Sequence, residues 1–135
     1  MSMVIDSSIV LAWFFDDEKD GSAGPVLDMV AENGAWVPTI WRLEVANGFR
    51  QGVKRRRIDL NGREQALASL TRLNIAVDPD TNAFAWTDTV ELSDRFSLTA
   101  YDASYLELAH RRALPLATLD QELRAAAKKL GVVVL

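Results

Sequence analysis

The sequence predicts an α/β domain in which a central, mostly parallel sheet is flanked by helices. Short apolar runs with the length of buried strands alternate with longer segments of helical spacing. The runs are continuously apolar, which is typical of strands that helices cover on both faces. The chain has 135 residues, 49% of them hydrophobic and 25% charged, which fits one globular domain over residues 1–135.

The expected strands are bounded by turn residues or by acidic residues. The first ends at Asp6, after which Ser7 or Ser8 can cap a helix. The second is stopped by Pro38, and the third is broken by Asp78 and the residues after it. The expected strands cover residues 3–5, 35–37, 75–77, 116–118 and 132–135.

The expected helices carry recognisable start and stop signals. Pro25 is tolerated in a first turn, and Gly34 and Gly131 suit the position just after a helix. Asp59 or Asn61 stands near the start of another helix. A charged loop is expected over residues 16–21. The expected helices cover residues 9–15, about 23–33, about 39–56, roughly 60–73, 81–93, 100–112 and 119–130.

The bulk composition excludes several classes of site. The chain has no cysteine, which rules out thiolate metal sites, disulfides and cysteine nucleophiles. The first residues have no basic region, and no apolar run is long enough to span a membrane, so we expect a cytoplasmic protein with no membrane partner.

The net charge of −4 argues by itself against a general nucleic-acid binder. Four acidic residues that could bind a cation, Asp6, Glu44, Asp102 and Asp120, change this interpretation. Without them, the remaining 15 Asp and Glu balance the 15 Lys and Arg. The charge therefore leaves RNA and DNA open as substrates.

Two of these four residues follow expected strands. Asp6 and Asp120 lie at the carboxyl ends of strands, where ligands gather in α/β sheets. Each has an alternative role as a helix N-cap or first-turn acid, which favours the helix dipole. The functional hypothesis makes both of them ligands of a cation.

The other two lie on expected helices. Glu44 shares a face with Asn47, which can orient a neighbouring carboxylate, although a lone helical Glu is usually just solvated. Asp102 completes a capping-box pattern with Thr99, yet it also begins an apolar stripe, where a carboxylate must be paired or metal-bound.

The four carboxylates are best explained as parts of one cation-binding site. No local motif generates their long, unequal intervals, and folding could bring them together. Clustered carboxylates repel each other and stay ionised when cations hold them. Hard divalent cations prefer such oxygen ligands.

Four segments carry a resemblance to a known family. Val4-Ile5-Asp6-Ser7-Ser8, Glu44-Val45-Ala46-Asn47, Tyr101-Asp102-Ala103 and Thr118-Leu119-Asp120-Gln121-Glu122-Leu123 resemble the PIN-domain ribonucleases, and their order most resembles VapC-type toxins of toxin–antitoxin pairs. The resemblance covers nearly the whole chain.

The resemblance implies a three-layer α/β/α fold and metal-dependent cleavage of RNA. Asp6, Glu44, Asp102 and Asp120 match the family's acidic positions, which hold Mg²⁺ or Mn²⁺. It further implies homodimerisation and inhibition by a small VapB-like antitoxin. The matching accessory polar residues are Ser7, Asn47 and Thr118.

Further residues have two interpretations each. Lys54, Arg55, Arg56 and Arg57 end a helix, either as a solvated terminus or as an RNA-binding patch. The single His110 is expected on the surface and not as a catalytic base.

Three other classes of function compete with the ribonuclease toxin, and the first is another Mg²⁺ enzyme of α/β architecture. A phosphatase of the haloacid dehalogenase type would need an Asp at position 8, where this chain has Ser8, and a receiver domain fits no better. A PIN-like RNA-processing nuclease without an antitoxin and a non-catalytic binding module remain as alternatives.

Overall fold

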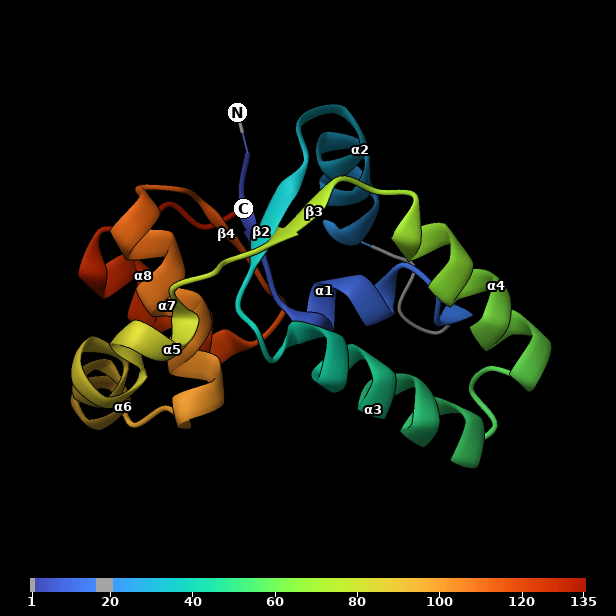
Figure 1. The fold of residues 1–135 in the computed structure, drawn as a ribbon. Helices are drawn as coiled ribbons and strands as arrows, with labels where there is room; N and C mark the ends of the chain where they lie inside the picture. Colours follow the sequence, from blue (N-terminus) through green and yellow to red (C-terminus); the bar gives the residue numbers. More distant parts are fainter. Residues whose placement is uncertain (1, 17–20) are drawn as a thin grey trace.

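The computed structural model describes residues 2–16 and 21–135 (Figure 1). Helices and strands alternate along these residues, as the apolar pattern predicted. Most of the charged loop expected at residues 16–21 lies outside the described residues. The elements are β1 (Val4–Ile5), α1 (Ser7–Ala12), α2 (Ala23–Asn33), β2 (Ala35–Val37), α3 (Trp41–Lys54), α4 (Leu60–Thr71), β3 (Ile75–Val77), α5 (Thr81–Phe84), η2 (Ala85–Thr89), α6 (Val90–Phe96), α7 (Ala100–Arg112), β4 (Leu116–Ala117) and α8 (Gln121–Leu130).

The strands form one four-stranded sheet in the order β3-β2-β1-β4, and every neighbouring pair is parallel. Val4 on β1 pairs with Trp36 on one side and with Leu116 on the other. Val4 and Ile5 are fully buried, as expected for an interior strand that helices cover on both faces. The parallel arrangement brings the carboxyl ends of all four strands to one edge.

Helices flank the sheet in two groups (Figure 1). Along one side, α1 contacts α2 and α3, and α3 contacts α4. On the other side, α7 packs against β1 and β4 and also contacts η2, α6 and α8. This arrangement is the three-layer α/β/α architecture that the resemblance implied. It places the starts of α1, α3 and α7 around the carboxyl edge of the sheet.

None of the described helices is long and apolar enough to cross a membrane.

Two expected features at the ends of the chain differ from the structure. The first helix is capped by Asp6 rather than by Ser7 or Ser8, and it ends before Trp13. The expected strand at residues 132–135 is reduced to a single bridge between Val134 and Leu116. The Val132 N–H donates to the carbonyl of Ala127 at the end of α8, so the segment bonds to β4 only around Leu116, through the carbonyl of Val133 and the N–H of Leu135.

The single helix expected at residues 81–93 is three consecutive pieces. A π-helical stretch, η2, separates α5 from α6, and α6 continues to Phe96. The segment contains no Gly or Pro, the residues that usually mark a change of helix geometry, so its sequence carried no signal of the π turn.

An ion-pair network fixes α7 to the end of β3. Asp78 follows β3, is fully buried, and accepts hydrogen bonds from Arg111 at 2.6 Å and from Arg112 at 3.0 Å. Arg111 also donates to Glu107 at 2.7 Å, one turn earlier on α7. Desolvation raises the pKa of Asp78, but the two guanidinium groups outweigh this effect and leave the pKa below its ordinary value. The network holds in place the helix whose first turn carries Asp102.

Candidate functional site

Asp6 is held rigidly at the carboxyl end of β1. Its side chain is 5% exposed and caps α1, with Oδ1 accepting from the Ile9 N–H at 3.1 Å. The same oxygen accepts from the Ser8 hydroxyl at 2.7 Å, and Oδ2 accepts a short hydrogen bond from the Thr118 hydroxyl. The cap and the candidate ligand are therefore one residue, and the two interpretations of Asp6 are compatible.

Thr118 joins the ends of β1 and β4. The Asp6 N–H donates to the carbonyl of Ala117 at 3.2 Å, which brings the two strand ends together. The fully buried Thr118 accepts from the Asp120 N–H at 3.0 Å. The Ser8 hydroxyl accepts from the N–H of Leu119 at 3.0 Å, so Ser8, a residue that the sequence analysis did not single out for the site, also links the two strand ends.

Asp120 caps the helix after β4. Its Oδ1 accepts from the Leu123 N–H at 2.9 Å, which is the capping role weighed from the sequence. Only one carboxylate oxygen is used by the cap. The other oxygen stays available to the acidic site.

Glu44 lies in the first turn of α3 and is half-buried. Its Oε1 accepts a hydrogen bond of 2.5 Å from the hydroxyl of Tyr105, a buried residue of α7. Asn47, which we expected to orient a neighbouring carboxylate, is exposed. Tyr105 is the side chain that donates to Glu44 in the structure, and its spacing of one turn after Asp102 was the signal in the sequence that could have indicated it.

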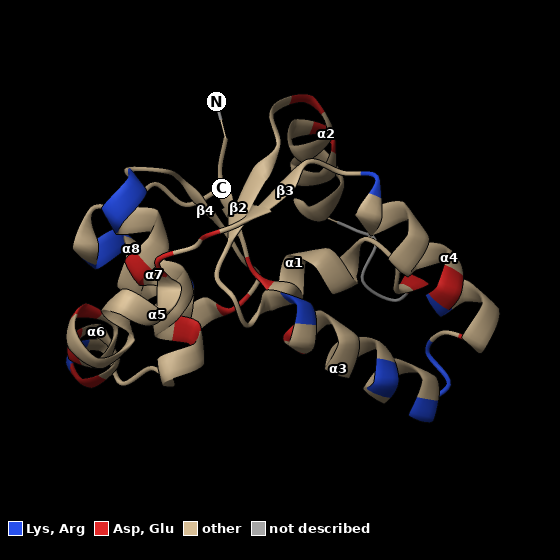
Figure 2. Ribbon diagram, viewed as in Figure 1, with Lys and Arg blue, Asp and Glu red and all other residues tan. Residues whose placement is uncertain are grey.

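Asp102 lies in the first turn of α7 and is half-buried. Thr99 caps this helix, because its hydroxyl accepts from the Asp102 N–H at 3.1 Å. The Asp102 carboxylate lies close enough to Glu44 and Asp6 for its charge to raise the pKa of both groups. In Figure 2, acidic segments gather where α1, α3 and α7 meet.

Burial raises the pKa of Asp6, Glu44 and Asp102 above the ordinary carboxyl value. Hydrogen bonds from neighbouring hydroxyls, such as the one from Thr118 to Asp6, lower the pKa and offset part of the rise. The charged neighbours that act on these three pKa values are all acidic: Asp102 acts on Asp6 and Glu44, and Asp120 acts on Asp102. The site thus concentrates negative charge from several acidic side chains.

Burial also raises the pKa of Tyr105, and the carboxylate of Glu44 raises it further. The phenol therefore stays protonated at neutral pH and acts as a donor to Glu44.

The donor chemistry of the site fits a divalent cation. All the candidate ligands are carboxylate oxygens, the ligands that Mg²⁺ and Mn²⁺ prefer. Among residues 2–16 and 21–135, however, no three acidic or histidine side chains converge closely enough to hold one ion. Repulsion between carboxylates works against such convergence, so an ion shared by several of them requires their side chains to move together.

The clustered negative charge is expected to lower the free energy of unfolding, and Asp102→Asn should restore part of it. The pKa of Asp102 in the folded protein lies above its ordinary value of 3.8, so ionisation of this group destabilises the fold. The variant should therefore melt at a higher temperature than the wild type in EDTA at about pH 7. The advantage should shrink as the pH falls through the raised pKa and Asp102 becomes protonated.

Differential scanning fluorimetry at several pH values measures this effect. Asp94→Asn is a suitable control, because Asp94 is exposed on α6, away from the acidic set. An unchanged or lower melting temperature for Asp102→Asn would show that Asp102 is not under electrostatic strain.

The basic segment Lys54–Arg57 lies at the far end of α3 from Glu44. Lys54, Arg55 and Arg56 are exposed, and the Arg57 guanidinium stacks on Phe15 at 4.3 Å. In Figure 2, Lys and Arg colour the end of α3 and the loop that follows it. The structure therefore separates this segment from the acidic site by most of the length of α3.

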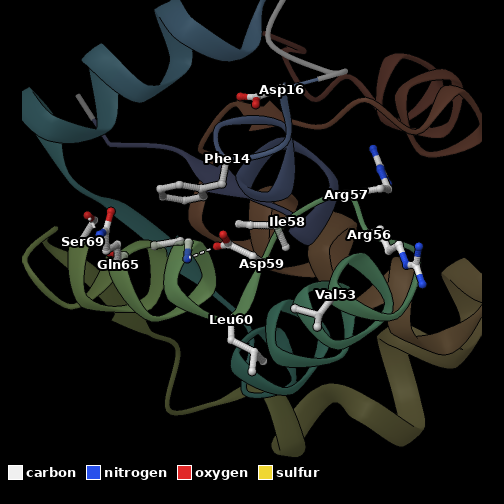
Figure 3. Close-up of a pocket in the computed structure, with 12 residues that line it drawn as sticks. Phe14, Asp16, Val53, Arg56, Arg57, Ile58, Asp59, Leu60, Gln65 and Ser69 are labelled. Carbon is white, nitrogen blue, oxygen red and sulfur yellow. Dashed lines mark hydrogen bonds between the residues drawn. The ribbon is translucent and has the colours of Figure 1, made fainter.

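A hollow of about 760 Å³ opens beside this segment, between the end of α3 and the start of α4 (Figure 3). Arg56 and Arg57 lie at one end of it, and Gln65 and Ser69 lie at the other. Its lining is mixed and carries none of the four candidate acidic ligands. His110 is exposed, as expected for a surface histidine.

Comparison with known proteins agrees with this architecture. The PIN domain family model matches residues 3–129. VapC ribonuclease Mb0985 of Mycobacterium bovis and Ribonuclease VapC9 of Mycobacterium tuberculosis are each 30% identical to the chain over 123 residues, which cover 90% of this chain and 87% of theirs.

Two solved structures share the fold. PAE2754 from Pyrobaculum aerophilum superposes with a TM-score of 0.67 at 22% identity, covering 99% of this chain and 92% of its own. VapBC2 from Rickettsia felis, solved bound to a DNA fragment from its promoter, gives a TM-score of 0.62 at 15% identity, covering 100% and 98%. The family match and the curated relatives establish that this chain belongs to the PIN-domain family and, within it, to the VapC group.

Proposed function

We propose that this protein is a metal-dependent endoribonuclease that acts as the toxin of a type II toxin–antitoxin pair. The observation that carries the proposal is the set of acidic residues at the carboxyl edge of the sheet, where burial and acidic neighbours raise the pKa values of Asp6, Glu44 and Asp102. The relatives named VapC ribonuclease support the same reaction class. We expect it to act in the cytoplasm, where its RNA substrate is found.

We assign direct contacts with Mg²⁺ or Mn²⁺ to Asp6 and Asp102. Glu44 and Asp120 ligate a second ion or act through water, and Thr118 or Ser7 holds a water molecule or the phosphate. A bound ion of this kind neutralises phosphate charge and lowers the pKa of a coordinated water. No side-chain nucleophile is required, which agrees with the absence of cysteine.

The chain's own contribution is to hold the ligands in place. Ser8, Thr118 and the Ile9 N–H restrict the carboxylate of Asp6. Tyr105 restricts that of Glu44 through its hydroxyl. Groups that orient ligands in this way raise metal affinity, and losing one costs about 10- to 100-fold.

A small VapB-like antitoxin and a second copy of the chain are the proposed protein partners. The VapBC2 assembly from Rickettsia felis shares the fold and supports the antitoxin assignment. The competing proposal is a PIN nuclease for RNA processing without an antitoxin. A small antitoxin gene immediately upstream would favour the toxin.

The proposal is tested by incubating the purified protein, free of antitoxin, with total cellular RNA and Mn²⁺ or Mg²⁺. Parallel reactions contain EDTA or the Asp102→Asn variant. Discrete fragments that vanish in both controls would establish a metal-dependent endoribonuclease, and the fragment ends would identify the RNA target. A folded protein that cleaves no RNA with either ion would leave a non-catalytic binding module as the better description.

The basic segment gives a separate prediction about RNA affinity. Neutralising Lys54→Gln, Arg55→Gln and Arg56→Asn should reduce the salt dependence of binding, because each lost phosphate contact lowers the slope by about 0.7 for single strands. Asn is chosen at Arg56 because this residue has a left-handed backbone with a φ of 59°. Arg57 is left unchanged because it stacks on Phe15.

The measurement is RNA affinity against salt concentration, with EDTA present. A slope smaller by about 2 is expected for the triple variant. Lys128→Gln with Lys129→Gln, at the end of α8, serves as the control. Equal slopes for the triple variant and the wild type would leave Lys54–Arg57 as a solvated helix end.

A further inference from the structure

Two exposed apolar side chains immediately precede the two half-buried carboxylates of the site. Leu43 is 75% exposed and precedes Glu44 on α3, and Tyr101 is 61% exposed and precedes Asp102 on α7. Exposed large apolar side chains lose the favourable free energy of burial. Because these two side chains lie beside the acidic residues, we expect a ligand bound at the acidic site to cover them.

The face of α7 that carries Tyr101 can be assigned from Tyr105. Residues four apart lie on the same side of a helix, so Tyr101 and Tyr105 share a face. Tyr105 donates to Glu44 on α3, which shows that this face is turned toward α3. Tyr101 lies one turn, about 5.4 Å, closer to the start of α7, and helical side chains lean toward that end. Tyr101 therefore stands at the exposed rim of the acidic site.

We propose that Tyr101 is a stacking platform for an unpaired base of RNA next to the scissile phosphate. The inference rests on the nuclease function proposed above. A cation bound by Asp6 and Asp102 would attract the scissile phosphate, and the attached nucleotide would then lie near Tyr101, the residue next to Asp102. An aromatic ring offers that base a sequence-tolerant surface.

Duplex RNA cannot use this platform, because its bases are stacked within the helix and are not free to splay onto a side chain. Leu43 offers a second apolar surface next to Glu44. The phenol ring of Tyr101 is not needed for the core, since most of it is exposed. Its replacement should therefore leave the fold unchanged.

The test measures RNA binding by the otherwise wild-type protein, the parent, with Ca²⁺ in place of Mg²⁺ or Mn²⁺, so that a cation can hold the phosphate at the intact acidic site. Tyr101→Ala, Tyr101→Phe and Trp86→Ala are compared on a fluorescein-labelled single strand and on a duplex of the same sequence. Trp86 is a matched control, because it is 92% exposed but lies on η2, which carries none of the four acidic site residues.

Tyr101→Ala should weaken single-strand binding about 5- to 150-fold, the range for loss of one base–aromatic stack. Tyr101→Phe keeps the ring and should bind like the parent, and Trp86→Ala should be neutral. Duplex binding should not respond to Tyr101→Ala. The fluorescence of a 2-aminopurine base in the bound strand should be quenched by the parent and by Tyr101→Phe. This quenching should be lost only in Tyr101→Ala.

Equal affinities for Tyr101→Ala and the parent would overturn the proposal, as would a loss that Tyr101→Phe shares or that appears equally with the duplex. A changed oligomeric state with unchanged RNA affinity would assign Tyr101 to a protein interface and also overturn it. The nuclease function is judged separately by cleavage with the wild-type protein. If the wild-type protein cleaves RNA and Tyr101→Ala leaves RNA affinity unchanged, the nuclease function stands and the stacking role of Tyr101 is rejected.

Discussion

Asp6→Asn is expected to reduce RNA cleavage at least about 100-fold, because loss of a group that merely orients a metal ligand already costs 10- to 100-fold. The fold should survive, since Asn is as good an N-cap as Asp and can still accept from the Ile9 N–H. The variant should also lose the rise in melting temperature that Mn²⁺ gives the wild type. Cleavage rates and Mn²⁺ titrations by scanning fluorimetry measure the two effects independently.

Asp59→Asn is the matched control for this substitution. Asp59 also caps a helix, accepting from the Gly62 N–H at 2.7 Å, but it is exposed at the start of α4 and outside the acidic set. It should retain full cleavage and the full response to Mn²⁺. Wild-type activity in Asp6→Asn would remove Asp6 from the proposed mechanism.

Asp78→Ala is expected to destabilise the fold by about 2–4 kcal/mol. Breaking a fully buried ion pair costs about 3–5 kcal/mol, and the estimate is lower here because Arg111 and Arg112 are partly exposed. Arg111 also keeps its bond to Glu107. Urea unfolding at neutral pH measures the loss, and Asp80→Ala is a control, since Asp80 is exposed and its side chain does not cap α5.

The pH dependence of this loss identifies its cause. The pKa of Asp78 is lowered in the folded protein, so its stabilising contribution is complete above the unfolded value of 3.8 and disappears as the pH falls through the folded value. The difference between wild type and Asp78→Ala should therefore shrink in acid. A difference that stays constant as the pH falls well below 3.8 would point to lost packing rather than to lost ion pairing.

Secondary structure was predictable wherever it depends on local pattern. The strands that begin at Val4, Ala35 and Ile75 read as continuous apolar runs, and Gly34 and Gly131 adopt the positive φ expected after a helix. The π turn after Phe84 and the single bridge at Val134 were not predictable. Neither segment contains a Gly or Pro after its first residue that would signal the change from a regular helix or strand.

The sequence by itself determined the α/β class and the acidic residues that make up the candidate site, because strand ends and helix starts are encoded in short segments. Only the tertiary structure decided which partners hold these residues. Ser8 and Thr118 meet Asp6, and Tyr105 meets Glu44, across long stretches of chain. The attachment of α7 through Asp78 is equally non-local. Such contacts arise from the packing of parallel strands and their covering helices, for which no local spacing rule exists.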